Sequence, residues 1–302
     1  MPHIGANGIS LFYEDHGDPD HDTILLVMGL GAHLGYWPDE FVAALVAKGY
    51  RVICFDNRDI GLSEKFERAR APGLAWQIIR KQIGFPAKVP YTLNDMADDA
   101  AGLLDALGIA RAHVVGASMG GMIAQLMAIG HPDKLLSLTS IMSTTGNPRL
   151  PQADKEAMDA LIAPINSLSE EDIVSHGINV ARKIGSPGYR PDDQILRERV
   201  LRMVRRSVYP QGLPRQLAAI IDDGDRRTRL AQVTTPALVL HGEDDPLVKL
   251  AGGEETARSI PGAKLVTIPG WGHDLPLPLI SRLTDEIALH ASVARSVMPA
   301  IA

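Results

Sequence analysis

Ser118, Asp245 and His273 have the residue types, and stand in the order along the chain, that acyl transfer requires. A serine hydroxyl is a weak nucleophile until a histidine within hydrogen-bonding distance takes its proton. The histidine in turn needs a carboxylate that fixes its tautomer and stabilises the imidazolium as it forms. The turns that hold the three residues each follow an apolar run of strand length. We therefore predict that these residues form a catalytic triad.

The sequence around Ser118 matches the pattern G-x-S-x-G, from Gly116 to Gly120, between an apolar run and a helical pattern over 122–128. In that context the pattern predicts a nucleophile elbow, a sharp strand-to-helix turn that exposes the serine. The glycines are needed because the helix passes close over the end of the strand. The N–H of Met119 would then be one donor to an oxyanion. A glycine-rich turn that only packs a helix onto a sheet is the alternative.

The other two members of the predicted triad lie in the turns 242–248 and 270–274, each just beyond a predicted strand. In a parallel sheet such turns meet at the carboxyl edge, where open α/β folds build their sites. We choose Asp245 over Asp244 and Glu243 as the acid because the proline that follows Asp245 favours an extended conformation pointing into the site. Asp274, beside the histidine, is predicted to be a surface neighbour.

A second oxyanion donor is predicted in the turn after the first buried strand, residues 28–31. We assign it to the Leu30 N–H, since Gly29 lets the chain come close to the substrate. Gly29 and Trp37 are assigned to substrate binding, in a pocket walled by Leu30, Trp37, Met119 and residues of a cap. An apolar lining of this kind favours a neutral, moderately hydrophobic ester over a charged substrate.

Apolar runs alternate with helical patterns along the chain, which predicts an α/β fold with a mostly parallel sheet covered by helices on both faces. An Asn-Gly turn before residues 9–14 predicts an N-terminal hairpin at one antiparallel edge. The predicted buried strands are Thr23–Met28, Arg51–Phe55, a strand beginning at Val114, Leu135–Met142, Pro236–His241 and Lys264–Ile268.

The alternation stops between residues 146 and 229, where the sequence is helical, charged and interrupted by prolines. We expect this segment to be a helical cap (lid) subdomain, inserted into a core domain made of residues 1–145 and 230–302. The polar segment 64–90 is also expected to contribute to the lid or to the entrance of the site.

Composition narrows the classes of protein that the chain can belong to. The formal net charge of −6 argues against a nucleic-acid partner, and the basic run 202–206 is expected to be a solvated helix face. The single cysteine, Cys54, excludes an internal disulfide. No signal peptide is evident, and the longest apolar runs are much shorter than the roughly 20 residues of a membrane helix. We expect a cytoplasmic protein with no membrane partner, of unknown oligomeric state.

No His, Cys or carboxylate cluster has metal-ligand spacing, and no glycine loop other than the elbow has a phosphate-binding pattern. We therefore expect neither a metal nor a cofactor. The other histidines considered, His113, His131 and His241, are expected to be structural.

Taken together, these motifs resemble the α/β-hydrolase superfamily over nearly the whole chain. The resemblance implies an α/β-hydrolase fold with a mostly parallel central sheet of about eight strands. It rests on the elbow, Asp56-x-Arg58-x-x-Gly61-x-Ser63, Gly242-x-x-Asp245-Pro246 and Gly272-His273. Asp56 and Arg58 are expected to form a buried ion pair that braces the loop beside the site.

More narrowly, the chain resembles the aclacinomycin methylesterase group of carboxylic ester hydrolases. The shared stretches are Val27-Met-Gly-Leu, Trp37-Pro-Asp-Glu-Phe41 and His113-Val-Val-Gly-x-Ser-Met-Gly. Most relatives open the oxyanion turn with His-Gly, and here Met28 stands in place of that histidine. The change keeps the backbone donor and removes a polar side chain, so it affects the shape of the substrate site.

We predict a serine carboxylic ester hydrolase that acts through an acyl-enzyme on Ser118. The same triad could carry out cofactor-free perhydrolysis of the haloperoxidase type, or C–C bond hydrolysis. A ligand-binding receptor that keeps the triad is the alternative outside enzymes. Dehalogenases and epoxide hydrolases are disfavoured because they need a carboxylate at the elbow.

Overall fold

The computed structural model describes residues 2–71, 73, 76–77, 89–165, 167 and 169–297. Much of the segment 64–90, with its expected contribution to the lid or entrance, lies outside these residues. No described helix combines the length and the apolar composition needed to cross a membrane.

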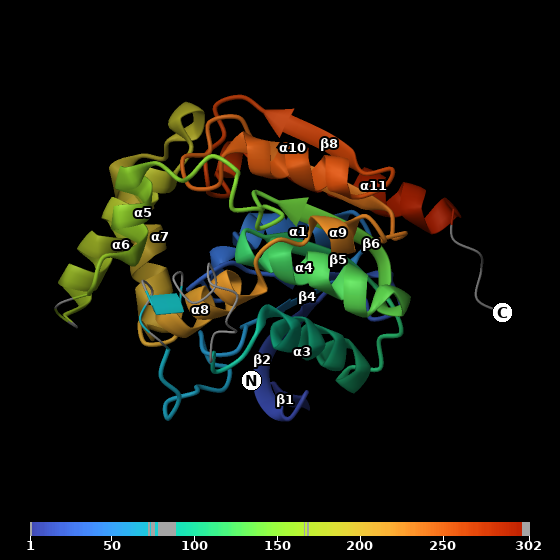
Figure 1. Cartoon of the computed structure of the whole chain (residues 1–302), viewed down its shortest axis with the longest axis horizontal. Coiled ribbons are helices and arrows are strands. Elements are labelled where there is room, and N and C mark those ends of the chain that lie inside the picture. The colour runs from blue at the N-terminus through green and yellow to red at the C-terminus, as the bar shows by residue number, and fades with distance from the viewer. Residues whose placement is uncertain are drawn as a thin grey trace.

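A sheet of eight strands runs through the middle of the molecule, in the order β1-β2-β4-β3-β5-β6-β7-β8 (Figure 1). The first two strands are antiparallel to their neighbours and all other pairs are parallel. This confirms the predicted sheet and its antiparallel edge. The strands are β1 (His3–Ala6), β2 (Ile9–His16), β3 (Thr23–Val27), β4 (Arg51–Phe55), β5 (Ala112–Ala117), β6 (Leu135–Ile141), β7 (Ala237–Gly242) and β8 (Lys264–Ile268).

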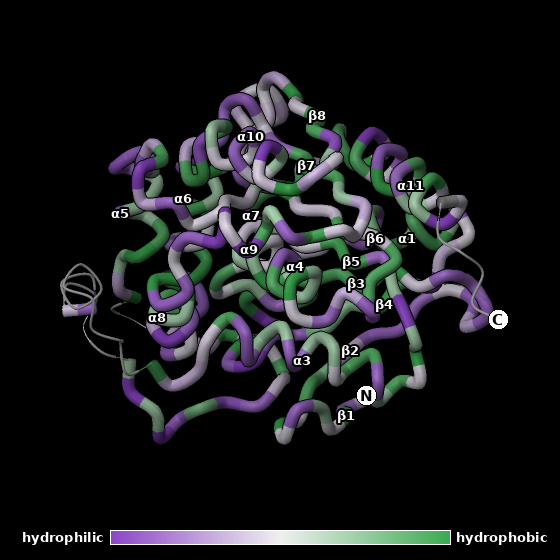
Figure 2. Tube along the Cα trace, turned by 45° about the vertical axis from the view of Figure 1, so that its right-hand side comes forward, coloured by the Kyte–Doolittle hydropathy of each residue, from purple (hydrophilic) through white to green (hydrophobic). Residues whose placement is uncertain are grey.

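The central strands are rich in apolar residues and buried along their whole length because both of their faces are covered. Alternate residues of β3 enter different cores: Leu25 and Val27 pack on one side, Ile24 and Leu26 on the other. Figure 2 shows hydrophobic residues gathered along these strands.

Helices cover both faces of the sheet. On one face, α3 (Leu93–Ala106) and α4 (Met119–Gly130) contribute most of the helical side chains of the core, and α10 (Leu250–Ser259) packs on β7 and β8. On the other face, α1 (Asp39–Ala47) and α11 (Ile280–Val297) pack together over the second core.

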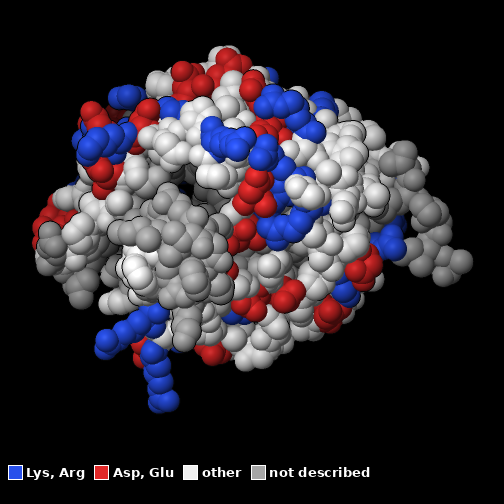
Figure 3. Space-filling model, in the orientation of Figure 1, with Lys and Arg blue, Asp and Glu red and all other residues white. Residues whose placement is uncertain are grey.

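The described part of the segment between β6 and β7 contains five α-helices and no strand. The first three pack against one another as a lobe at the left of Figure 1, while α8 and α9 return to the core through Ala219 and Leu230. Figure 3 shows basic and acidic side chains interspersed on this lobe. The helices are α5 (Lys155–Ile162), α6 (Glu170–Ile184), α7 (Asp193–Arg206), α8 (Leu213–Asp223) and α9 (Arg227–Leu230).

Candidate active site

Ser118 lies between the end of β5 and the start of α4, with φ 56° and ψ −119°. This backbone conformation is strained for a residue with a side chain, and it persists only where the surroundings hold it. The surroundings are tightly packed: a Cβ on Gly116 would lie 2.0 Å from Gly120 O, and one on Gly120 would lie 2.0 Å from Val27 O. Ser118 N also donates to Ile141 O at 2.9 Å. Strand-to-helix packing therefore holds the serine in this conformation.

The three predicted triad residues come together at the carboxyl ends of β5, β7 and β8. His273 Nε2 lies 3.0 Å from Ser118 Oγ, and His273 Nδ1 lies 2.7 Å from Asp245 Oδ2. Asp245 is 2% exposed and His273 is 8% exposed, whereas Ser118 is half-buried. The hydroxyl therefore remains accessible while the two groups behind it are shielded from water.

Asp245 is held in place through its second carboxylate oxygen. Oδ1 accepts hydrogen bonds of 2.8 Å from the N–H groups of both Leu247 and Val248. The neighbouring Asp244 points elsewhere, since its Oδ2 accepts from Gly270 N at 2.7 Å. Of the two candidate acids, Asp245 is the one that contacts the imidazole.

The predicted oxyanion turn faces the serine. A Cβ on Gly29 would lie 3.1 Å from the Cβ of Ser118, so the backbone of the turn passes directly beside this serine. The N–H groups of Leu30 and Met119 donate no hydrogen bond within the described part of the chain. These two groups are therefore free to bind an oxygen atom of a ligand.

Trp37 is not on a substrate-accessible surface, which corrects its assignment as a pocket wall. Its side chain is 2% exposed and packs against Phe41, with ring centroids 5.1 Å apart. The residue ends a short 3-10 helix, η1 (Leu34–Tyr36), and turns into the core. Gly29 does border the site, as described above.

The expected Asp56–Arg58 ion pair does not form. Arg58 instead makes a double hydrogen bond with Asp99 on α3, at 2.6 Å for each contact. Asp56 pairs with Arg206 of α7 at 3.0 Å and accepts the N–H groups of Leu34 and Leu62. Asp56 and Arg58 thus brace the loop through other partners.

The run 202–206 is only partly the solvated face that was expected. Arg202 and Arg205 are exposed and pair with Asp39 and Glu170. Arg206 turns inward to Asp56, because successive residues on a helix point in different directions.

Two residues from the inserted helices contact the site and were not predicted. Gln216, on α8, accepts the Gly31 N–H at 2.9 Å and donates to Arg58 O at 2.9 Å. Ser186, after α6, donates to the carboxylate of Asp274. Both residues lie in sequence that has no recognisable motif, so no signal was available to single them out.

Asp274 is not the surface neighbour that was expected. It is partly buried, and Oδ1 accepts the Ser186 N–H at 3.1 Å as well as the Ser186 hydroxyl. Burial raises the pKa of the Asp274 carboxyl, and the hydrogen bonds from Ser186 act in the opposite direction. The residue joins the loop of His273 to the inserted helices.

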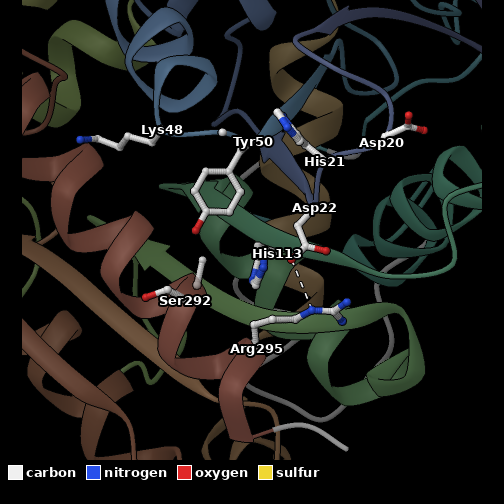
Figure 4. A pocket seen from close by; sticks show the side chains of 10 residues that line it. Asp20, His21, Asp22, Lys48, Tyr50, His113, Ser292 and Arg295 are labelled. Atoms are coloured by element: carbon white, nitrogen blue, oxygen red, sulfur yellow. Dashed lines mark ion pairs between the residues drawn. The ribbon is translucent and has the colours of Figure 1, made fainter. Parts of the chain in front are cut away.

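A cavity of about 480 Å³ lies at the opposite edge of the sheet, beside His113 at the start of β5 (Figure 4). Ser118 lies five positions after His113 along the chain, which corresponds to about 16 Å of strand. Figure 4 shows the ion pair between Asp22 and Arg295 that borders this cavity. The cavity is therefore separate from the triad.

The other two histidines have partners of their own. His241 Nε2 contacts Val248 O at 2.8 Å, directly beneath Asp245, and His131 pairs with Asp98 at the surface. Among the described residues there is no group of three or more His, Cys, Asp or Glu side chains that could hold a metal ion.

Comparisons with known proteins agree with this architecture. The sequence profile of the alpha/beta hydrolase fold matches residues 22–277. The chain is 29% identical to rhodomycin D methylesterase DnrP of Streptomyces peucetius, over 96% of this chain and 98% of that protein.

Two solved structures are also similar over nearly their full length. The enol-lactonase of Burkholderia xenovorans LB400 is 26% identical, with a TM-score of 0.69, and the match covers 97% of this chain and 98% of that one. A hydrolase of Pseudomonas aeruginosa PA01 is also 26% identical, with a TM-score of 0.66, and the match covers 98% and 97%.

Proposed function

The chain belongs to the alpha/beta hydrolase fold family, and from this premise we propose that it hydrolyses a carboxylic ester through an acyl-enzyme on Ser118. The observation that carries the proposal is the continuous hydrogen-bonded series from Ser118 Oγ through the His273 imidazole to Asp245 Oδ2, with distances of 3.0 and 2.7 Å. Both are hydrogen-bonding distances, and the first is short enough for His273 to take the proton of the serine hydroxyl.

In the acylation step, Ser118 Oγ bonds to the ester carbonyl carbon and its proton passes to His273 Nε2. The negative charge that develops on the carbonyl oxygen is stabilised by the N–H groups of Leu30 and Met119. Collapse of this tetrahedral intermediate breaks the bond to the alcohol oxygen, which takes the proton from His273. The acyl group remains on the serine.

Deacylation repeats these steps with water as the nucleophile. His273 Nε2 takes a proton from the water as its oxygen bonds to the acyl carbon, and then returns the proton to Ser118 Oγ. The carboxylic acid leaves and the enzyme is restored. Throughout both steps, Asp245 Oδ2 accepts a hydrogen bond from His273 Nδ1–H. This bond keeps the proton on Nδ1, so that Nε2 remains the base.

For the substrate we propose a neutral, moderately hydrophobic ester of a small alcohol, and a methyl ester in the first instance. The similarity to a protein named as a methylesterase supports the small alcohol. The similarity to a structure named as an enol-lactonase supports a cyclic ester as a second candidate substrate.

We also propose that residues 146–229 act as a cap over the site. The contacts that support this role are made by three residues of the inserted helices with the loops around Ser118. Gln216 binds the oxyanion turn, Arg206 binds Asp56, and the Met203 carbonyl lies 3.0 Å from His33 Nε2.

A labelling experiment tests the function directly. A fluorophosphonate probe should modify the wild-type protein once, with the adduct mapped to Ser118 by mass spectrometry. The variant Ser118→Ala should lose both labelling and hydrolysis of short methyl esters, while keeping its thermal unfolding temperature. Unchanged ester hydrolysis by the variant would overturn the assignment. Labelling at another serine would show that the other serine is the nucleophile.

A further inference from the structure

The loop that carries His273 is attached to the inserted helices by backbone hydrogen bonds. The N–H of His273 itself donates to Ile184 O, in the last residue of α6, at 2.7 Å. Three residues before the histidine, Gly270 O accepts the N–H of Gly188 at 2.9 Å. The segment that follows α6 therefore lies along the histidine loop and fixes its main chain.

Ser186 lies at the centre of this contact and is 1% exposed. Its Oγ accepts the Gly272 N–H at 2.9 Å and donates to Asp274 Oδ1. The Ser186 N–H donates to the same carboxylate oxygen at 3.1 Å. One hydroxyl thus connects the residue before His273 to the residue after it.

We propose that Ser186 is a positioning residue for His273, and that the inserted helices hold the imidazole in line with Ser118 through it. This inference rests on the function proposed above. The hydroxyl touches none of the reacting atoms, and acts through the backbone on both sides of the histidine.

The physical reason is the precision that proton transfer needs. A catalytic group must be held within about 0.5 Å of its productive position by the residues around it. The ring of His273 is anchored by Asp245 at Nδ1 alone, since Ser118 must remain free to react. The position of the His273 ring therefore depends on the main chain around it. Ser186 holds this main chain on the side that faces the inserted helices.

The core holds the same loop from the other side. Trp271, which is fully buried, donates from Nε1 to Asp274 O at 2.7 Å, and its carbonyl accepts the Asp244 N–H at 3.1 Å. Loss of the Ser186 hydroxyl should therefore displace the histidine without releasing the loop, and we expect a partial loss of rate.

The variant Ser186→Ala tests the proposal. It removes the acceptor of the Gly272 N–H and one donor to Asp274, so kcat should fall roughly 10-fold with KM changed less than 2-fold. The rate of fluorophosphonate labelling of Ser118 should fall by a similar factor, because that reaction needs the same base. Ser169→Ala is the matched control: Ser169 caps the other end of α6 by accepting the Asp172 N–H, at 3.1 Å, and its loss should leave kcat unchanged.

Two variants of Asp274 separate positioning from a general loss of folding. Asp274→Asn keeps an oxygen for both Ser186 donors and should retain kcat within about 2-fold, whereas Asp274→Ala should behave like Ser186→Ala. Thermal unfolding of every variant is measured alongside. The proposal fails if Ser186→Ala keeps wild-type kcat and labelling rate, or if both fall only in proportion to the fraction unfolded. A wild-type protein that neither labels nor hydrolyses esters would instead overturn the proposed function.

Discussion

Gln216 Oε1, on α8, accepts a hydrogen bond of 2.9 Å from the N–H of Gly31, the residue that follows the proposed oxyanion donor Leu30. The same side chain donates to Arg58 O at 2.9 Å and is fully buried. An inserted helix therefore fixes the turn on which the oxyanion would bind.

The variant Gln216→Ala should lower kcat roughly 10-fold, because it releases the turn without removing the donors themselves, whose direct loss costs about 10²- to 10³-fold. The measurement is steady-state hydrolysis of a short methyl ester. Gln194→Ala, on the exposed side of α7 where Gln194 contacts Glu198, should leave kcat unchanged. Equal rates for the two variants would show that the turn does not need α8.

The variant Asp245→Asn should lower kcat/KM about 10³- to 10⁴-fold at neutral pH. Two backbone donors, the N–H groups of Leu247 and Val248, face Oδ1 and would select the oxygen of the new amide. The amide NH₂ must then face His273 Nδ1, which forces the proton to Nε2, where it blocks proton transfer from Ser118. Hydrolysis is measured with thermal unfolding as a check on folding, and a loss under 10-fold would contradict the role of this carboxylate.

The variant Gly120→Ala should prevent folding or cost more than about 3 kcal/mol, since its Cβ would lie 2.0 Å from the backbone oxygen of Val27. Gly130→Ala, at the other end of α4, is the control. A Cβ there meets nothing within 4 Å, so that variant should be as stable as the wild type or slightly more stable. Denaturant unfolding compares the two, and equal stabilities would contradict the close approach of α4 to β3.

The sheet and the juxtaposition of Ser118, Asp245 and His273 could be predicted because their signals are local in the sequence. An apolar run such as Thr23–Val27 followed by glycines predicts a buried strand and its turn without knowledge of distant residues. In a parallel sheet the carboxyl ends share one edge, so three turns distant in sequence can be placed together.

Contacts between the inserted helices and the core could not be predicted in this way. The partner of Asp56 is Arg206, which is 150 positions away and stands in a run of similar basic residues. Which arginine of that run turns inward depends on how α7 is rotated against the core. The assignment of Trp37 to the pocket wall was wrong for a related reason. A large aromatic residue after the predicted oxyanion turn can line a pocket or enter the core, and only the packing of Trp37 against Phe41 shows that it enters the core.

The variant Arg206→Ala should cost about 3 kcal/mol of stability, because it leaves the Asp56 carboxylate buried without its counter-charge. Asp56 is fully buried and the Arg206 side chain is 18% exposed. Arg205→Ala is the control from the preceding position of the same helix. Arg205 and Glu170 form an exposed pair, and its loss should leave the free energy of unfolding nearly unchanged. Urea unfolding measures both, and a similar cost for the two would show that Arg206 contributes only a surface interaction.

Stability should fall in mild acid through His113, which is 1% exposed and whose Nε2 has no hydrogen-bond partner in the described structure. Burial lowers the pKa of this imidazole from 6.5 to about 4. The unfolded chain therefore binds a proton between pH 6.5 and 4 that the folded chain does not. The contribution of this residue is fully present above pH 6.5 and is lost as the pH falls toward 4, by up to about 3 kcal/mol.

Replacing the residue, as in His113→Asn, should flatten the dependence of unfolding free energy on pH across this window. The measurement is urea unfolding at pH 8, 6 and 4.5. Because the variant loses packing at every pH, its free energy of unfolding at pH 8 serves as the reference. The test is how steeply this free energy falls between pH 8 and pH 4.5. Other buried histidines, including His241, also have pKa values lowered by burial. Part of the pH dependence of the unfolding free energy should therefore remain in the variant. An unchanged slope in the variant would show that His113 takes up its proton without unfolding, through access from the cavity beside Tyr50 and Arg295.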